Sequence, residues 1–202
     1  SLRTYIDGYN SEMGGKFMAL KETNDTNLVV AICTPLMQRV HTLLKHSGEM
    51  VCIDASSNMD RYGCSVFLIL THSSAGGLPL GVFVTTSESQ ATITIAVALN
   101  LYLSILPPTC FAGRGKLGPE VIMTDDSTAE QKAIQQVFPA AQRLLCVFHI
   151  LQAVWCCLWD AKNKISIKDQ HPSHFLHIKR LIYANTVEEF EELFKNTQGN
   201  PT

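Results

Sequence analysis

The residues with the clearest capacity for chemistry are two aspartates that follow short apolar runs. Residues 50–53 precede Asp54, and residues 121–124 precede Asp125. Because a carboxylate is costly inside a strand, an aspartate at the end of one usually meets solvent or a metal ion. Two such carboxylates can hold divalent cations about 3.5–4 Å apart, as phosphodiester chemistry by two metals requires. Mg²⁺ suits this role because it takes oxygen ligands and keeps positions open for water and phosphate.

The neighbouring acids have simpler interpretations. Taken singly, each aspartate of the pair is explained by ending a strand and beginning a turn, so the site depends on both lying at the tips of adjacent strands. Asp126 is either a supporting acceptor beside the metal or a residue favoured before a helix N-terminus. Glu130 occupies the reciprocal position of a capping box that begins at Ser127, and we assign it to that cap.

Cysteine and histidine spacings point more weakly to metal. Cys146-Val147-Phe148-His149 has the spacing of half a zinc site, but no second pair of ligands matches it. We therefore expect Cys146 to be a core thiol at the end of a strand, with His149 near the active-site edge. His171, His174 and His177 recur every third residue, which on a helix drifts by roughly 60° per step, so we expect a solvated face.

The elements that must position the aspartates follow from the hydrophobic periodicity. Three β-rich runs come first, with Gly76-Gly77 in the hairpin turn between the second and third, and two further strands are each reached through a helix. The predicted strands span about 50–53, 64–71, 78–85, 121–124 and 143–147. The predicted helices of this region span about 87–106, 127–138 and 149–160.

This order of elements predicts an α/β protein with a ribonuclease H-like fold. Its mixed five-stranded sheet would consist of an antiparallel meander of three strands plus two parallel strands, flanked by helices and followed by a C-terminal helical extension. In that arrangement the first and fourth strands lie side by side. Asp54 and Asp125 would then face each other at the sheet edge, although 71 positions separate them.

Length and composition allow one core with a small appendage. The 202 residues are 46% hydrophobic and 17% charged, which is typical of globular proteins. A net charge of −2 provides no general attraction to nucleic acid. No apolar run is long enough to span a bilayer, no secretory signal opens the chain, and seven cysteines without framework spacing favour a reducing compartment. We expect a helical lead-in over 1–48, the ribonuclease H-like core over 49–160, and the start of a truncated helical insertion over 161–202.

Several motifs resemble the transposase domain of Mutator-like elements, the MULE domain. They cover about residues 49–159, and the last block, with its order and spacing, is quite specific. In chain order they are Cys52-Ile53-Asp54-Ala55-Ser56 with Asn58, Gly77-Leu78-Pro79-Leu80-Gly81, Val121-Ile122-Met123-Thr124-Asp125, Ala133-Ile134 with Val137-Phe138-Pro139, and Cys146-Val147-Phe148-His149.

The resemblance implies a ribonuclease H-like DDE transposase that uses Mg²⁺ or Mn²⁺ to cut DNA at element ends and join it to a target. Asp54 and Asp125 correspond to its first two catalytic acids. Cys146 and His149 correspond to its Cys-x-x-His motif, interpreted as structural support. The implied partners are transposon-end and target DNA, with a homo-oligomer allowed and no membrane, and the implied location is the nucleus.

The motifs fit an active transposase and also proteins with other functions. The family's third acid, a Glu, follows a helical insertion in which this chain is expected to end, so the fragment is expected to be catalytically incomplete. One alternative is a domesticated descendant that binds DNA or chromatin without cutting. Another is a cellular ribonuclease H-like nuclease, which the long helical tail and the Cys-x-x-His block disfavour.

Overall fold

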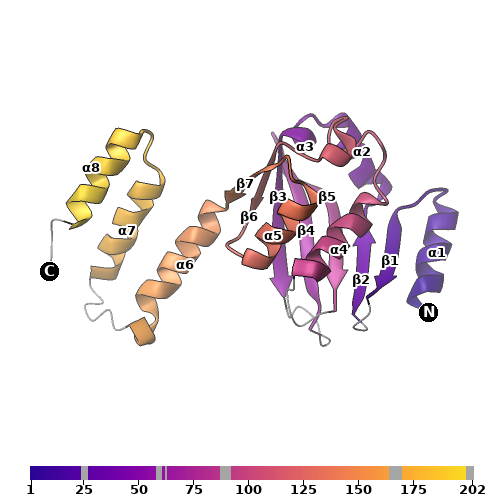
Figure 1. Ribbon diagram of the computed structural model, residues 1–202, viewed down its shortest axis with the longest axis horizontal. Helices are drawn as coiled ribbons and strands as arrows, with labels where there is room; N and C mark the ends of the chain where they lie inside the picture. The colour runs from indigo at the N-terminus through magenta and orange to yellow at the C-terminus, as the bar shows by residue number, and fades with distance from the viewer. Residues whose placement is uncertain (24–26, 58–60, 62, 87–91, 164–169, 199–202) are drawn as a thin grey trace. The chain divides into compact units, whose positions relative to one another are not determined.

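A mixed sheet of seven strands forms the framework of the fold (Figure 1). The computed structural model describes residues 1–23, 27–57, 61, 63–86, 92–163 and 170–198. Its strands are β1 (Met18–Glu22), β2 (Leu28–Ile32), β3 (Met50–Ser57), β4 (Ser65–Ser73), β5 (Gly76–Thr85), β6 (Val121–Thr124) and β7 (Gln142–Leu145). Across the sheet they run in the order β1-β2-β5-β4-β3-β6-β7.

Helices connect the strands and follow the last one. In chain order they are α1 (Leu2–Glu12), α2 (Pro35–Leu43), α3 (His46–Glu49), α4 (Thr92–Leu103), α5 (Thr128–Val137), α6 (Val147–Trp159), α7 (His171–Ile182) and α8 (Val187–Gln198). α2 begins with the residue types that favour a helix start, because Thr34 is its N-cap and Pro35 its first helical residue. The predicted caps Ser87 and Ser89, and Asn58 of the first motif, lie outside the described residues.

The prediction of a five-stranded sheet is wrong. β3, β4 and β5 pair in antiparallel succession and β6 pairs parallel to β3, as expected. However, β2 pairs with the far side of β5 and β1 pairs with β2, so the sheet has seven strands in a different order. Residues 28–32 fit either a strand or a helical turn in the sequence, and pairing with β5 decides between them. The expected helical lead-in over 1–48 therefore also contains two strands.

The core lies between the sheet and the helices that cover it. α4 packs against β2, β5 and α5, and both α4 and α5 are drawn in front of the sheet in Figure 1. Phe67 of β4 stacks on Phe83 of β5, with ring centroids 4.4 Å apart and both side chains fully buried. Burying large side chains of this kind stabilises a fold by roughly 1.5–3 kcal/mol each.

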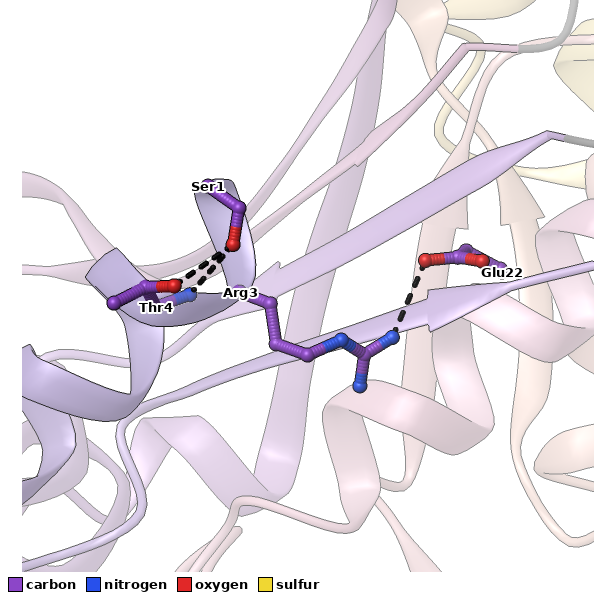
Figure 2. A network of polar contacts seen from close by, with 4 residues as sticks. All are labelled: Ser1, Arg3, Thr4 and Glu22. Carbon is purple, nitrogen blue, oxygen red and sulfur yellow. Dashed lines mark hydrogen bonds and ion pairs between the residues drawn. The ribbon is translucent and has the colours of Figure 1, made fainter.

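The first helix is attached to the sheet edge by surface contacts. Figure 2 shows Arg3 of α1 reaching Glu22 of β1, with Nη2 and Oε1 3.2 Å apart. The Ser1 hydroxyl caps the helix by accepting from the backbone N–H of Thr4. Because both side chains of the ion pair are mostly exposed, the pair contributes about 0–1 kcal/mol.

The chain divides into two compact units, Ser1–Leu144 and Leu145–Thr202. In the second unit, Trp155 and Trp159 of α6 stack with centroids 4.0 Å apart, and Phe175 of α7 meets Trp155 edge-on. His171 is only 2% exposed and lies against Trp159, so the expected solvated face is wrong for this histidine. The aromatic ring of Trp159 supplies the apolar cover that sequence spacing alone did not reveal. No helix in the described part of the chain is long and apolar enough to cross a membrane.

Candidate active site

The parallel pairing of β3 with β6 brings Asp54 and Asp125 to the same level. Cys52 pairs with Met123 at the end of the ladder. Asp54 is two residues beyond Cys52, and Asp125 is two residues beyond Met123, so the two aspartates are equivalent in register. Neighbouring strands lie about 4.8 Å apart, which places the two backbones within reach of a shared cation. The expected adjacency of the first and fourth strands of the motif is thus confirmed.

The end of β6 opens space beside Asp54. β6 stops at Thr124, whereas β3 continues through Ser57 and pairs on its other side with β4, where Asp54 lies opposite Leu68. The side chain of Asp54 is exposed. A carboxylate there can meet solvent or a cation without being taken into the core, which avoids most of the desolvation cost.

The turn after β6 holds Asp125 in place. Its Oδ1 accepts from the backbone N–H of Ser127 at 2.9 Å, and its carbonyl accepts from Gln131 Nε2 at 3.3 Å. Asp125 is half-buried, and Asp126, next to it, is exposed. Such a side-chain-to-backbone bond two residues on is the usual way an aspartate fixes a turn. It also fixes the position of a carboxylate at the strand tip.

Glu130 is the residue of this site that the sequence interpretation missed. The Ser127 hydroxyl accepts from the backbone N–H of Glu130 at 3.4 Å, which confirms the cap at Ser127. The reciprocal half of the capping box is wrong, because Ser127 N–H donates to Asp125 while the Glu130 carboxyl turns inward. Its Oε2 accepts from the Thr124 hydroxyl at 2.7 Å, and the side chain is 1% exposed.

Burial and negative charge act together on the Glu130 carboxyl. Desolvation raises its pKa to about 7, the hydrogen bond from Thr124 opposes this, and the charges of Asp125 and Asp54 add to the rise. Oε1 is buried and has no hydrogen-bond partner among the described residues. The carboxyl groups of Asp125 and Asp54 therefore lie close enough to act on the Glu130 carboxyl at this edge of the sheet. Residue 130 lies three and four positions before Ala133 and Ile134, so the helical stripe could have marked it as buried.

Cys146 and His149 both lie at the start of α6, in the second unit. Cys146 is the N-cap and His149 the third helical residue, and both are half-buried. β7 ends at Leu145 and α6 begins at Val147, so Cys146 caps a helix and does not end a strand as predicted. The ring of His149 meets Phe148 edge-on, with centroids 5.4 Å apart. Within the described residues, neither side chain belongs to a group of three metal-ligand side chains.

Carboxylates of this kind fit a hard divalent cation better than a soft one. Asp54 and Asp125 offer only oxygen donors, which Mg²⁺ and Mn²⁺ accept and thiophilic metals disfavour. In comparison with known families, a model described as the MULE transposase domain matches residues 50–153, which include all the site residues discussed above. A search of curated proteins gave no match.

Proposed function

Because this chain belongs to the MULE transposase domain family, we propose that it is the catalytic core of a Mutator-like DDE transposase. The proposed reaction is metal-dependent cleavage of DNA at element ends and transfer of the cut strand to a target. The observation that carries the proposal is the parallel pairing of β3 with β6, because Asp54 and Asp125 each follow by two residues the last pair of this ladder, Cys52 and Met123. The β3-β4-β5 meander with β6 beside β3 supports a ribonuclease H-like core over 49–160.

Asp54 and Asp125 are the proposed metal ligands and catalytic residues. Bound Mg²⁺ or Mn²⁺ would supply activation of the attacking oxygen and stabilisation of the leaving oxygen. The exposed Asp54 carboxylate approaches from β3, and the Asp125 carboxylate is oriented by its bond from Ser127. Asp126, exposed beside Asp125, is proposed as a further acceptor for metal-bound water.

Glu130 is a proposed positioning residue. Its carboxyl group accepts a hydrogen bond from the hydroxyl of Thr124, the residue directly before Asp125. This bond fixes the end of β6. With a pKa of about 7, Glu130 is partly protonated at neutral pH. Its protonation reduces the negative charge close to Asp54 and Asp125. Cys146 and His149, at the N-terminus of α6, are proposed to support the fold that follows the sheet.

DNA is the proposed partner, and the nucleus is the proposed location, both from family membership. The net charge of −2 means that phosphate contacts must come from local basic side chains or from the bound metal ions. A homo-oligomer that holds two element ends together is compatible with this function. The alternative, a domesticated protein that binds DNA without cutting, differs in requiring no metal at the Asp54/Asp125 pair.

The first test is calorimetric titration of the chain with Mg²⁺ and, separately, Mn²⁺. Saturable binding that is lost in both Asp54→Asn and Asp125→Asn is the expected result, because each variant removes one anionic oxygen and keeps the shape of the side chain. Asp7→Asn is the matched control, since it makes the same change at an exposed aspartate of α1, outside the site, and should retain binding. Metal binding that survives both substitutions would exclude the assigned site. Absence of binding in the wild type would mean that Asp54 and Asp125 do not suffice to hold the ion in this chain, and the same titration would then be made on the full-length protein.

A further inference from the structure

Two histidines and one glutamate gather at the other end of β3. His46 and Glu49 come from α3, and His72 comes from the end of β4. Each offers one ligand atom, and these atoms all lie within 4.8 Å of one another. His46 and Glu49 are half-buried and His72 is exposed. It is the one group of three metal-ligand side chains within the described parts of the chain.

The fold explains why these three side chains meet. Positions three apart on a helical turn share a face, so His46 and Glu49 project together from α3. Glu49 is followed directly by β3, where Val51 pairs with Thr71 in the antiparallel ladder with β4. His72 is therefore opposite the start of β3. The Thr71 hydroxyl donates to the Met50 carbonyl at 2.9 Å, which links β4 to β3 at this end.

The side chains are arranged as ligands around a shared point. The rings of His46 and His72 are 4.4 Å apart between centroids and inclined by 53°. Nδ1 of His46 is buried and has no hydrogen-bond partner in the described parts of the chain. Coordination of a metal ion through this nitrogen would provide the partner that the buried polar atom lacks.

We propose that His46, Glu49 and His72 bind a zinc-like divalent transition-metal ion at a site separate from the Asp54/Asp125 pair. Two imidazole nitrogens and one carboxylate oxygen are a three-ligand set that Zn²⁺ accepts, with water in the fourth position. Mg²⁺ strongly prefers oxygen and would not use the two imidazoles. Asp54 is four residues further along β3 than Met50, which is about 13 Å at 3.3 Å per residue. The two metal sites would thus differ in both position and ion.

Lys45 is the competing group at this site. Its Nζ lies 3.0 Å from Glu49 Oε1 in an exposed ion pair. Such pairs are weak, so a divalent cation with two additional nitrogen ligands can displace the ammonium group. Lys45→Met should therefore leave zinc binding intact or strengthen it.

The test is calorimetric titration of the chain with Zn²⁺ at pH 7.5, comparing the wild type with His72→Gln. His72 is exposed, so this change should preserve the fold while removing one ligand. We expect one equivalent of zinc to be lost, or its affinity to fall by more than the roughly 10–100-fold that loss of an outer partner costs. His174→Gln is the matched control, because His174 is an exposed histidine of α7 outside the cluster.

The seven cysteines of the chain are a second source of zinc affinity, and the variants separate the two sources. His72→Gln and Glu49→Gln leave every cysteine in place, so a cysteine site would persist in both. A thermal-melting comparison with and without Zn²⁺ provides an independent readout, since a ligand that binds only the native state raises its stability. Equal zinc stoichiometry and equal zinc-induced stabilisation in wild type, His72→Gln and Glu49→Gln would overturn the proposal. Neither outcome depends on Mg²⁺ binding at Asp54 and Asp125.

Discussion

Glu130 makes the stability of this protein depend on pH through a single buried carboxyl group. Its pKa rises from 4.5 to about 7 on folding, mainly through desolvation. Below pH 4.5 the group is protonated in both the folded and unfolded states. Between 4.5 and 7 the folded state holds a proton that the unfolded state has released, so the free energy of unfolding decreases as pH rises. Above about pH 7 the stabilisation from this protonated group has been lost.

Glu130→Gln should remove this contribution. The amide keeps an acceptor for the Thr124 hydroxyl and stays neutral, so we expect the variant to be more stable than wild type at pH 8, by on the order of 1–3 kcal/mol, and to show a smaller difference at pH 5. The measurement is urea unfolding at both pH values in the presence of EDTA. If Glu130 also positions Asp125, Mg²⁺ affinity should change in this variant although the fold is more stable.

The informative quantity is the difference in the free energy of unfolding between Glu130→Gln and wild type at each pH. His41 is buried and its pKa is lowered to about 4, so its contribution to stability has the opposite sign and is lost as pH falls from 6.5 to 4. The two contributions partly cancel in the wild-type curve. Glu12→Gln, at an exposed carboxylate of α1, is the control and should show no pH-dependent difference. A Glu130→Gln variant that is less stable than wild type at pH 8 would contradict the assignment.

At the scale of single elements, Gly81 allows β5 and α4 to approach each other closely. A Cβ atom at this position would collide with the ring of Tyr102. Tyr102 cannot move aside, because its hydroxyl donates to the Leu80 carbonyl at 2.9 Å and lies 2.6 Å from His41 Nε2. The backbone N–H of Phe111 donates to His41 Nδ1, so Nε2 carries the hydrogen and the Tyr102 oxygen accepts it. The glycine thus preserves a fully buried polar network.

Gly81→Ala should therefore destabilise the protein by about 1–3 kcal/mol, the usual cost of overpacking a core. Gly77→Ala is a matched control in the same strand, since its added Cβ would meet nothing within 4 Å. That change should alter stability by no more than about 0.5 kcal/mol. Thermal unfolding of the two variants beside wild type is the measurement, and equal melting temperatures for both would show that the Tyr102 network does not limit the approach of α4.

Local signals in the sequence predicted the helices and strands better than they predicted which strands pair and which side chains are buried. The β3-β4-β5 meander, β6 and α5 each carry their own turn residues, apolar period or cap, and all were found. β1 and β2 were not predicted as part of the sheet, because β2 joins it only through pairing with β5, 50 to 56 positions further along the chain, and β1 joins it only through β2. The inward turn of Glu130 and the burial of His171 likewise depend on neighbours, Thr124 and Trp159, that set the local environment. The adjacency of β3 and β6, which bring Asp54 and Asp125 to the same edge of the sheet, was predictable because it depends only on the order of the elements.

At the scale of the whole molecule, the two compact units have very different interiors. The hydrophobic core cluster lies entirely within Ser1–Leu144. Among the described residues of Leu145–Thr202, only Leu158 and His171 are buried, at 8% and 2% exposure. The second unit is held mainly by half-exposed aromatic contacts of Trp155, Trp159 and Phe175. Since apolar burial is the dominant stabilising term, the second unit should be the less stable of the two.

The tryptophans allow this difference to be measured. Both tryptophans of the chain, Trp155 and Trp159, belong to the second unit, so fluorescence reports on that unit alone. We expect the fluorescence midpoint in urea to fall below the midpoint for loss of hydrogen-exchange protection in β3, β4 and β5. Two separate midpoints would mean that a single free energy of unfolding does not describe this protein.

Reciprocal variants make the test specific to each unit. Phe175→Ala removes the edge-on partner of Trp155 and should lower the fluorescence midpoint while leaving strand protection unchanged. Gly81→Ala should do the reverse, because the collision with Tyr102 lies in the first unit. Changes at sites that share no partners are additive, so the double variant should show both shifts at their single-variant sizes. If instead each substitution moves both midpoints together, the units unfold as one cooperative body, and the aromatic contacts of α6 and α7 must then stabilise the sheet that carries Asp54 and Asp125.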